Sequence, residues 1–283
     1  MEYIGLKDII KRALQEDIGH GDLTTMSLIP EDMQASGVFV AKSKGVLAGI
    51  QVSRAVYQYL EPDINFIMFK NDGDTLEAND LIARVTGKAM TLLTGERVAL
   101  NFLQRLSGIA SKTRQMVDMI KYLPVELVDT RKTTPGLRSL EKYAVSVGGA
   151  RNHRFGLYDG VMIKDNHIKA VGSIARAVSD ARKKIPHTIK IEIEVENLEQ
   201  LEQALEARAD IILLDNMKIE EIKQAVEITA GRAILEASGG INEETLVEVA
   251  KSGVDLISSG ALTHSAASLD ISFNITATGT VDS

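Results

Sequence analysis

The second half of the chain alternates short apolar segments with amphipathic ones, and this alternation constrains the fold more than any other feature. Strands are predicted at residues 125–129, 160–164, 189–195, 210–214, 233–237 and 254–258, and helices near 173–184, 198–207, 219–229 and 243–252. Strands that alternate with helices form a parallel sheet. Six strands, with a seventh near residues 151–157, predict an incomplete parallel α/β barrel of about seven strands. An open, doubly wound sheet is the alternative.

The first third of the chain follows a different pattern. Residues 3–15 and 52–60 have helical periodicity, residues 36–50, 64–69 and 81–86 are strand-like, and residues 91–122 form the longest helical stretch, with Gly108 as a candidate interruption. Short strands mixed with helices predict an α+β layer. The turn EDIGHGDLTT holds Asp17, His20 and Asp22. We interpret these three as local hydrogen-bonding groups rather than a metal site.

A concentrated positive region follows the first predicted barrel strand. Residues 131–164 contain seven Lys or Arg side chains and two acids, a net charge of +5 in a chain whose net charge is −7. A helix is predicted from Thr134 and Pro135 to Gly148. Single surface cations need no special explanation, but a cluster in an acidic protein indicates a polyanionic ligand. The cations follow the ends of predicted elements: Arg131, Lys132, Arg151, His153, Arg154 and Lys164.

The strand IKIEIEVEN places acids at alternate positions, Glu192, Glu194 and Glu196. Because successive strand side chains point to opposite faces, these three carboxylates are expected to point into the barrel. Buried carboxylates need a cation or hydrogen-bond partner. Asp215 ends the next strand, and Glu194 and Asp215 together suit ribose hydroxyls and Mg²⁺. Ion pairing with the cations of the positive region is the alternative, and the two are compatible in the empty protein.

Two loops that contain Gly follow the last two predicted strands. One loop holds Ser238, Gly239 and Gly240, and the other holds Ser259, Gly260 and Ala261. Gly lets backbone N–H groups approach phosphate, and a helix amino end favours negative charge. Barrels of this kind often bind phosphate at these two loops. The pair of loops therefore predicts a phosphate site.

Composition removes several classes of function. There is no Cys, which excludes disulfides and thiolate sites and fits a reducing compartment, and we expect a cytoplasmic protein. Apolar runs are too short for a membrane span, and residues 1–20 do not have the pattern of a signal peptide. The acidic balance and the scarcity of aromatic residues argue against nucleic-acid binding. No GxGxxG or Walker-type loop is present.

Long motifs in the chain resemble one known family. The strings DTRKTTPGLRSLEKYAV and GGARNHRFGLYDGVMIKDNHI, and later LLDN and SGGI, are similar nearly letter for letter to quinolinate phosphoribosyltransferase, the carboxylating nicotinate-nucleotide pyrophosphorylase. The resemblance extends from EDIGHGDLTT to LDIS. It implies transfer of phosphoribosyl from phosphoribosyl pyrophosphate to quinolinate, with loss of CO₂ and formation of nicotinate mononucleotide.

The resemblance also implies roles for individual residues. Arg131, His153, Arg154 and Lys164 match the positions that bind quinolinate, while Lys132, Glu194 and Asp215 match the catalytic positions around the ribose, the pyrophosphate and Mg²⁺. Glu194 and Asp215 would hold the metal, partly through the substrate. The two Gly loops match the phosphate loops. Thr130 and Arg138 belong to the same substrate-binding set, and no departure from the family pattern occurs at the carried-over positions.

The architecture that the resemblance implies has two domains and a homodimer. Residues 1–108 would form an α/β sandwich joined by residues 270–283, and residues 109–269 the barrel. Arg97, in the string GER, would reach the neighbouring subunit's site, and a higher oligomer is compatible with this. Two other functions stay open: a Schiff-base aldolase that uses Lys164, and a re-purposed relative similar to a molybdenum-transport-associated protein.

Overall fold

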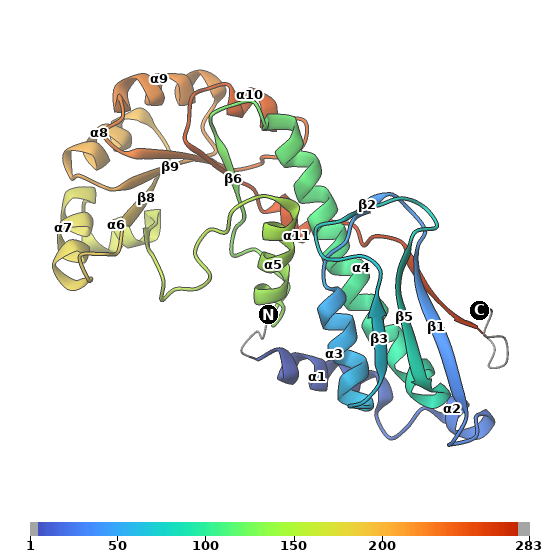
Figure 1. Cartoon of the computed structure of the whole chain (residues 1–283). Coiled ribbons are helices and arrows are strands. Elements are labelled where there is room, and N and C mark those ends of the chain that lie inside the picture. Colours follow the sequence, from blue (N-terminus) through green and yellow to red (C-terminus); the bar gives the residue numbers. More distant parts are fainter. Residues whose placement is uncertain (1–4, 277–283) are drawn as a thin grey trace. The chain divides into compact units, whose positions relative to one another are not determined.

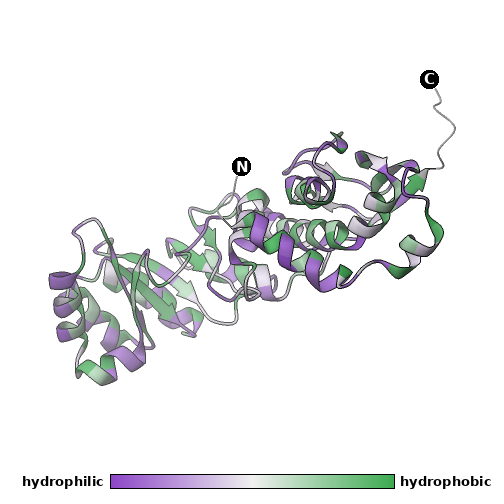
Figure 2. Ribbon diagram, turned by 90° about the horizontal axis from the view of Figure 1, so that it is seen from below, coloured by the Kyte–Doolittle hydropathy of each residue, from purple (hydrophilic) through white to green (hydrophobic). Residues whose placement is uncertain are grey.

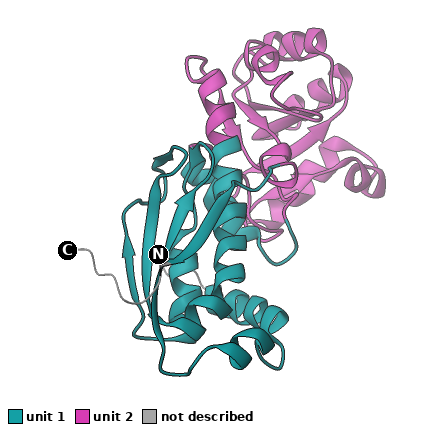
Figure 3. Cartoon of the chain, turned by 90° about the vertical axis from the view of Figure 1, so that its right-hand side faces the viewer, with its two compact units in different colours: residues 1–112, 134–148, 266–283 teal, residues 113–133, 149–265 magenta. Residues whose placement is uncertain are grey.

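The computed structural model describes residues 5–276, which divide into two compact units (Figure 3). Unit 1 comprises the described residues up to 112, residues 134–148 and the described residues from 266. Unit 2 comprises residues 113–133 and 149–265. These are packing units, so the prediction of two domains with boundaries at 108 and 270 stays a prediction.

Unit 2 is built on a six-stranded parallel sheet. Its strands are β6 (Glu126–Val128), β7 (Val161–Ile163), β8 (Ile191–Val195), β9 (Ile211–Asp215), β10 (Ile234–Ser238) and β11 (Leu256–Ser258). They lie in the order β6-β11-β10-β9-β8-β7. This order places β6 and β7 at opposite ends, as expected for an incomplete barrel. The predicted parallel α/β class is therefore confirmed.

The seventh strand predicted at residues 151–157 is reduced to one bridge between Val128 and Arg151. The backbone beyond it is held by carboxylates instead. Asp129 accepts a hydrogen bond from the N–H of His153, and Asp159 accepts from the N–H groups of residues 155 and 156. Because these donors are already used, they cannot form a ladder with a neighbouring strand. The prediction of seven strands is corrected to six.

Helices connect the strands of unit 2, and Figure 1 shows α7, α8 and α9 on the outer side of β8 and β9. The helices are α6 (Asp165–Val171), α7 (Ile174–Lys184), α8 (Leu198–Glu206), α9 (Ile219–Thr229), α10 (Leu246–Ala250) and α11 (Ala261–His264). Ser173 and Asn197 cap α7 and α8 with side-chain oxygens that accept backbone N–H bonds. The short helices α6 and α11 lack a strong apolar period and were not predicted.

Unit 1 contains a four-stranded antiparallel sheet in the order β12-β1-β5-β3. Its elements are α1 (Leu6–Ile18), α2 (Leu23–Leu28), β1 (Gln34–Ala41), β2 (Gly45–Val46), α3 (Ile50–Leu60), β3 (Asn65–Met68), β4 (Thr75–Leu76), β5 (Leu81–Lys88) and β12 (Ile271–Thr276). Phe39 packs against Phe273, with ring centroids 4.8 Å apart. β12 brings the end of the described chain into this sheet, and the contact between the two rings supplies its apolar anchor.

The long helix α4 (Ala89–Ile120) is continuous through Gly108. The predicted interruption there does not occur. A Cβ at Gly108 would lie 1.9 Å from the carbonyl oxygen of Ala267, so this position needs Gly for close backbone packing. Residues 89–112 of α4 belong to unit 1 and residues 113–120 to unit 2.

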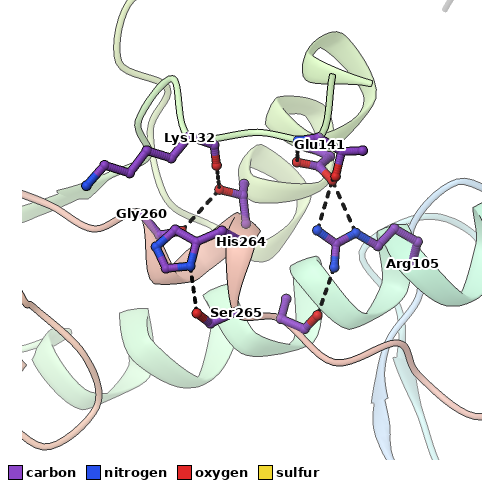
Figure 4. A network of polar contacts seen from close by, with 9 residues as sticks. Arg105, Lys132, Glu141, Gly260, His264 and Ser265 are labelled. Carbon is purple, nitrogen blue, oxygen red and sulfur yellow. Dashed lines mark hydrogen bonds and ion pairs between the residues drawn. The ribbon is translucent and has the colours of Figure 1, made fainter. Parts of the chain in front are cut away.

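Helix α5 (Arg138–Gly148) starts later than predicted and belongs to unit 1 rather than to the barrel unit. Leu137 donates to the carbonyl of Thr134 in a turn before the helix. Glu141 is fully buried and pairs with Arg105 at 2.9 Å, a contact drawn in Figure 4. Breaking a buried pair of this kind is strongly destabilising, which explains why α5 stays with unit 1.

The distribution of hydropathy agrees with globular units. Figure 2 shows that helices of both units carry hydrophilic and hydrophobic residues in alternation along their length. Apolar side chains on the sheet, such as Ile193 and Leu214, are fully buried. Within residues 5–276, no helix has the length and apolar character needed to cross a membrane.

Candidate active site

A cavity of about 530 Å³ opens at the carboxyl ends of the strands of unit 2. Side chains two residues apart on one strand face the same side of the sheet. Leu213 and Asp215 on β9 therefore face one wall of the cavity, as do Glu236 and Ser238 on β10. Glu194 on β8 belongs to the same wall. Eleven of the sequence-predicted site residues line this cavity: Thr130, Arg131, Lys132, His153, Arg154, Lys164, Glu194, Asp215, Ser238, Gly239 and Gly240.

The loop after β6 carries Thr130, Arg131 and Lys132 into the cavity. Thr130 accepts a hydrogen bond from the N–H of Lys132 at 3.0 Å. Thr263 on α11 donates its hydroxyl to the carbonyl of Lys132 at 2.7 Å and to that of Gly260 at 3.2 Å, and Figure 4 shows both acceptor residues. The loop after β6 is therefore tied to the loop after β11.

The three carboxylates that were expected to point inward from β8 do not all do so. Glu192 is 4% exposed and Glu194 has intermediate exposure, but Glu196 is exposed because the strand ends at Val195. Glu196 follows the strand end, so the strand period no longer fixes its direction. Lys164 Nζ forms an ion pair with Glu194. This is the ion pairing that the sequence left open as the alternative to ligand binding.

Asp215 and Gly239 lie on neighbouring strand ends and are linked by Asn216. Asn216 has φ 53° and donates from its side chain to Asp215 Oδ2 at 3.0 Å. Gly239 has φ 103°, and a Cβ there would lie 2.2 Å from Asn216 Oδ1. A larger residue at 239 is therefore excluded by both strain and contact. Gly240 also has positive φ and has open space beside it.

The loop after β11 differs from the expected phosphate loop in one respect. Ser259 is 2% exposed, and its hydroxyl donates to the carbonyl of Ile241 at 2.7 Å. The Ser259 hydroxyl thus fixes the neighbouring loop, while Ser258 lines the cavity. A Cβ at Gly260 would lie 2.9 Å from His264 Nε2 and 3.0 Å from Lys132 Cδ. His264 is thereby brought beside Lys132, a position that the sequence did not single out.

His153 is part of a buried cluster with two acids. Its Nε2 lies 3.1 Å from Glu192 Oε2 and 3.5 Å from Glu236 Oε2. Burial alone would lower the pKa of His153, but the hydrogen bonds and charges of Glu192 and Glu236 outweigh burial and raise it to about 10. Burial raises the pKa of Glu192, and the charge of Glu236 adds to this effect.

Two predicted site residues, Arg97 and Arg138, belong to unit 1. Arg97 lies on α4 and lines a pocket with Asp17, Asp22 and Leu23, among other residues of that unit. Arg138 is the first residue of α5. Asp22 caps α2 and accepts from the N–H of Thr25 at 3.0 Å, and its pKa is lowered by the Thr25 side-chain hydrogen bond. The interpretation of Asp22 as a local hydrogen-bonding group is confirmed.

Family models match nearly the whole chain. The N-terminal domain of quinolinate phosphoribosyl transferase matches residues 22–107, and its C-terminal domain matches residues 109–274. The chain belongs to the quinolinate phosphoribosyltransferase family. The resemblance found in the sequence motifs is thereby confirmed, and the chain is a phosphoribosyltransferase.

Curated relatives of the quinolinate phosphoribosyltransferase family cover the same length. A probable nicotinate-nucleotide pyrophosphorylase (carboxylating) of Bacillus subtilis is 47% identical over 276 residues, covering 98% of this chain and 95% of the relative. One from Methanocaldococcus jannaschii is also 47% identical, covering 94% and 96%. The crystal structure of NadC from Streptococcus pyogenes has a TM-score of 0.93 at 44% identity, with 98% and 99% covered.

Glu236, which lines the cavity, and His264, which lies beside Lys132, are two residues that sequence reasoning missed. Glu236 stands two residues before Ser238 on the same strand, so the period of two places both on the inward face. That signal was available in the string ILEAS. His264 had no such signal, because it lies on the four-residue helix α11, where neither helical nor strand periodicity fixes a direction.

Proposed function

We propose that this chain transfers phosphoribosyl from phosphoribosyl pyrophosphate to quinolinate, releasing pyrophosphate and CO₂ and forming nicotinate mononucleotide in de novo NAD biosynthesis. The observation that carries this proposal is one cavity in which cations and carboxylates from neighbouring strand ends converge. Arg131, Arg154 and Lys164 offer positive charge to a dicarboxylate. Glu194 and Asp215 offer negative charge to the cation that develops on the ribose.

The quinolinate half is the side of the cavity with Arg131, Arg154 and Lys164. Arginine presents several N–H donors in a planar fork that matches a carboxylate. Burial lowers the pKa of Arg154, and repulsion from the neighbouring charge of Arg131 lowers it further. A dianionic ring would relieve that repulsion. The two neighbouring guanidiniums in the cavity therefore support a dicarboxylate as ligand.

The phosphoribosyl half lies at Lys132, Glu194, Asp215 and the loop of Gly239 and Gly240. Carboxylate oxygens suit Mg²⁺, and the pair at two neighbouring strand ends fits such an ion when the pyrophosphate supplies further oxygens. Mg²⁺ bound there would neutralise charge on the leaving pyrophosphate. Lys132 would bind the pyrophosphate, and the Gly loop would bind the 5′-phosphate through backbone N–H groups.

The reaction follows from these charges. The quinolinate nitrogen attacks the ribose C1 while the bond between C1 and pyrophosphate breaks. Glu194 and Asp215 stabilise the positive charge that develops on the ribose. The ring nitrogen becomes cationic. The bond from C2 to its carboxylate then breaks, CO₂ leaves, and the electron pair stays on C2 beside the positive nitrogen. A proton is then added at C2 to give nicotinate mononucleotide.

The oligomer and the compartment are part of the same proposal. The chain would act as a head-to-tail homodimer in which Arg97 of one subunit enters the partner subunit's cavity, with a higher oligomer open. Family membership supports this, as does the place of Arg97 on α4, outside the set of residues that line the unit 2 cavity. The ligands would be small molecules rather than nucleic acid or membrane. The lack of Cys supports a cytoplasmic location.

A Schiff-base aldolase receives less support. Such an enzyme needs a neutral Lys as nucleophile. Lys164 Nζ instead forms an ion pair with Glu194. A re-purposed relative would keep the fold and change the ligand. The complete set of cations in the cavity favours quinolinate over this alternative.

The proposal is tested by incubating the purified protein with quinolinate, phosphoribosyl pyrophosphate and Mg²⁺ and following nicotinate mononucleotide. Lys132→Met is the matched control, because it removes the ammonium at the pyrophosphate position with little loss of volume. We expect product from the native protein and at least a hundredfold slower turnover, about 3 kcal/mol, from the variant. No product from the folded native protein would contradict the proposal.

A further inference from the structure

Two buried hydroxyl groups join the loops around the phosphoribosyl half of the cavity. Thr263, on α11, is fully buried and donates to the carbonyl of Lys132 at 2.7 Å. Ser259, in the loop after β11, is 2% exposed and donates to the carbonyl of Ile241 at 2.7 Å. Neither side chain is among the described residues that line the cavity. One hydroxyl therefore reaches the loop after β6 and the other reaches the loop after β10.

The Thr263 hydroxyl holds the backbone of Lys132. A hydroxyl has a single proton to donate. The carbonyl of Gly260 already accepts from the backbone N–H groups of Thr263 at 3.1 Å and of His264 at 3.0 Å, so the shorter bond to Lys132 is the main use of that proton. The N–H of Lys132 donates to the hydroxyl of Thr130 at 3.0 Å. The backbone of Lys132 is thus held on both sides of its Cα atom.

This attachment fixes where the long side chain of Lys132 begins. A Lys side chain has a flexible four-carbon stem, so the position of its ammonium depends on how the stem is supported. A Cβ at Gly260 would lie 3.0 Å from Lys132 Cδ, which places the stem against Gly260. In Figure 4 the Lys132 carbonyl points into the hydrogen-bond network, while its ammonium points away from it. Residues 260–263 therefore support both the start and the middle of this side chain.

The loop of Gly239 and Gly240 has an anchor of its own. Both residues have positive φ, 103° and 61°, and Gly leaves the backbone more freedom than any other residue. Ile241 follows directly, and its carbonyl is the acceptor of the Ser259 hydroxyl. The N–H of Ser259 donates to the carbonyl of Val128 on β6 at 3.1 Å. The Gly loop is thereby attached at its end to the parallel sheet.

We propose that Thr263 and Ser259 are positioning residues for the two ends of phosphoribosyl pyrophosphate. Thr263 positions Lys132 for the pyrophosphate, and Ser259 positions the loop of Gly239 and Gly240 for the 5′-phosphate. The inference rests on the proposed function, which gives Lys132 and the Gly loop those two roles. Because the two hydroxyls bond different loops, each acts on one end of the ligand.

A purely structural role is the competing interpretation of the same two bonds. A buried carbonyl that loses its donor is costly wherever it lies. Removal of either hydroxyl therefore lowers the free energy of unfolding under both interpretations, and stability does not separate them. Affinity for each end of the ligand does separate them, because a structural loss would weaken both ends alike or neither.

Matched variants remove each hydroxyl separately. Thr263→Val and Ser259→Ala each remove one hydroxyl, and Thr263→Ser keeps it. Thr263→Ala takes the place of Thr263→Val if the latter does not fold. Thr229→Val is the control, because Thr229 on α9 is 2% exposed and its hydroxyl has no hydrogen-bond partner among the described residues. Thermal unfolding of each variant establishes that it is folded before binding is measured.

Binding of each end is measured by calorimetry on the full chain, with inorganic pyrophosphate and Mg²⁺ in one titration and ribose 5-phosphate in another. We expect Thr263→Val to raise the Kd for pyrophosphate about tenfold, about 1.4 kcal/mol, and that for ribose 5-phosphate less than about twofold. Ser259→Ala should have the reverse effect. Thr263→Ser and Thr229→Val should stay within about threefold of native for both. Equal effects of Thr263→Val and of Ser259→Ala on both probes, or no effect on either probe, would overturn the proposal.

A double variant tests whether Thr263 acts through Lys132. Lys132→Met removes the ammonium that Thr263 positions, so adding Thr263→Val to it should weaken pyrophosphate binding less than about twofold further. A further tenfold loss would mean that Thr263 acts by another route, and would overturn the proposal. Because these titrations contain no quinolinate, a protein inactive with quinolinate would refute the proposed function and leave the comparison of variants readable.

Discussion

Lys164 Nζ and Glu194 Oε2 form an ion pair across the neighbouring parallel strands β7 and β8. The Lys164 side chain is 45% exposed and that of Glu194 is 17% exposed. One partner is proposed to bind quinolinate and the other to bind Mg²⁺. In the ion pair, the ammonium of Lys164 and the carboxylate of Glu194 neutralise each other. Quinolinate must therefore displace Glu194 from Lys164, and Mg²⁺ must displace Lys164 from Glu194.

Lys164→Met should weaken the reaction with quinolinate but lower the Mg²⁺ concentration that the reaction requires. Loss of the ammonium should lower kcat/KM for quinolinate by about 30- to 1000-fold, about 2–4 kcal/mol. The Mg²⁺ concentration for half-maximal rate should fall, because Glu194 no longer has a competing partner. Glu194→Gln is the matched variant and should raise the Mg²⁺ requirement. Titrating activity against Mg²⁺ checks both, and a parallel loss of both affinities in Lys164→Met would contradict the shared pair.

Gly239→Ala should impair the phosphate loop by more than the backbone strain of a non-Gly residue at this φ alone predicts. Gly239 has φ 103°, and the new methyl group would contact Asn216, which holds Asp215. We expect a loss of about 1–3 kcal/mol in the free energy of unfolding and a raised KM for phosphoribosyl pyrophosphate. Gly73→Ala is the control, because it has φ 97° with open space around it. Urea unfolding and steady-state kinetics of both variants would separate contact from strain.

Asp210 should contribute stability that is lost in acid. Burial would raise the pKa of Asp210, but Arg182 and the N–H of Ile191 lower it overall. A carboxyl with a lowered folded-state pKa stabilises the fold above its unfolded pKa near 3.9 and loses this effect as pH falls through the folded value. Asp210→Asn should therefore be about 1 kcal/mol less stable at pH 7. The difference should vanish toward pH 3. Urea unfolding at several pH values measures it, and a constant difference would contradict the assignment.

Mixed dimers test the shared site. Arg97→Ala and Lys132→Ala should each be nearly inactive alone. After mixing in equal amounts with reversible dissociation, about a quarter of the sites should regain both residues, because half the dimers are hybrids with one intact site. Recovery is measured as rate against mixing ratio. A mixture that stays as inactive as its components, while exchange of subunits is demonstrated, would argue against Arg97 acting in the partner subunit.

Periodicity predicted the strands of unit 2 well, since aliphatic runs such as IILL leave little choice of conformation. It failed where side chains override the backbone. Asp129 binds the backbone N–H of His153, 24 residues further along the chain, and no local pattern reveals a partner that far away. Asp159 binds the N–H groups of residues 155 and 156, which a seventh strand would also need. The buried pair of Arg105 and Glu141, 36 residues apart, keeps α5 in unit 1 in the same way.

The candidate site divides along similar lines. Asp215 is the last residue of β9, and Arg131 and Lys164 come shortly after β6 and β7, so the rule that strand ends meet at one edge places these three residues together. Glu236 could have been found only by also extending the inward-facing period of two from the strand end back into the strand. His264 depends on the turn after β11, and Glu196 on where β8 ends, which a period of two cannot determine.

The most direct test of the account is a comparison of quinolinate with nicotinate as acceptors. The purified protein, with phosphoribosyl pyrophosphate and Mg²⁺, would be given each acceptor, and nicotinate mononucleotide, pyrophosphate and CO₂ would be quantified. We expect equal amounts of all three from quinolinate and no mononucleotide from nicotinate, because Arg131, Arg154 and Lys164 are arranged for two carboxylates. Mononucleotide formed from nicotinate at a comparable rate, or none from quinolinate, would contradict it.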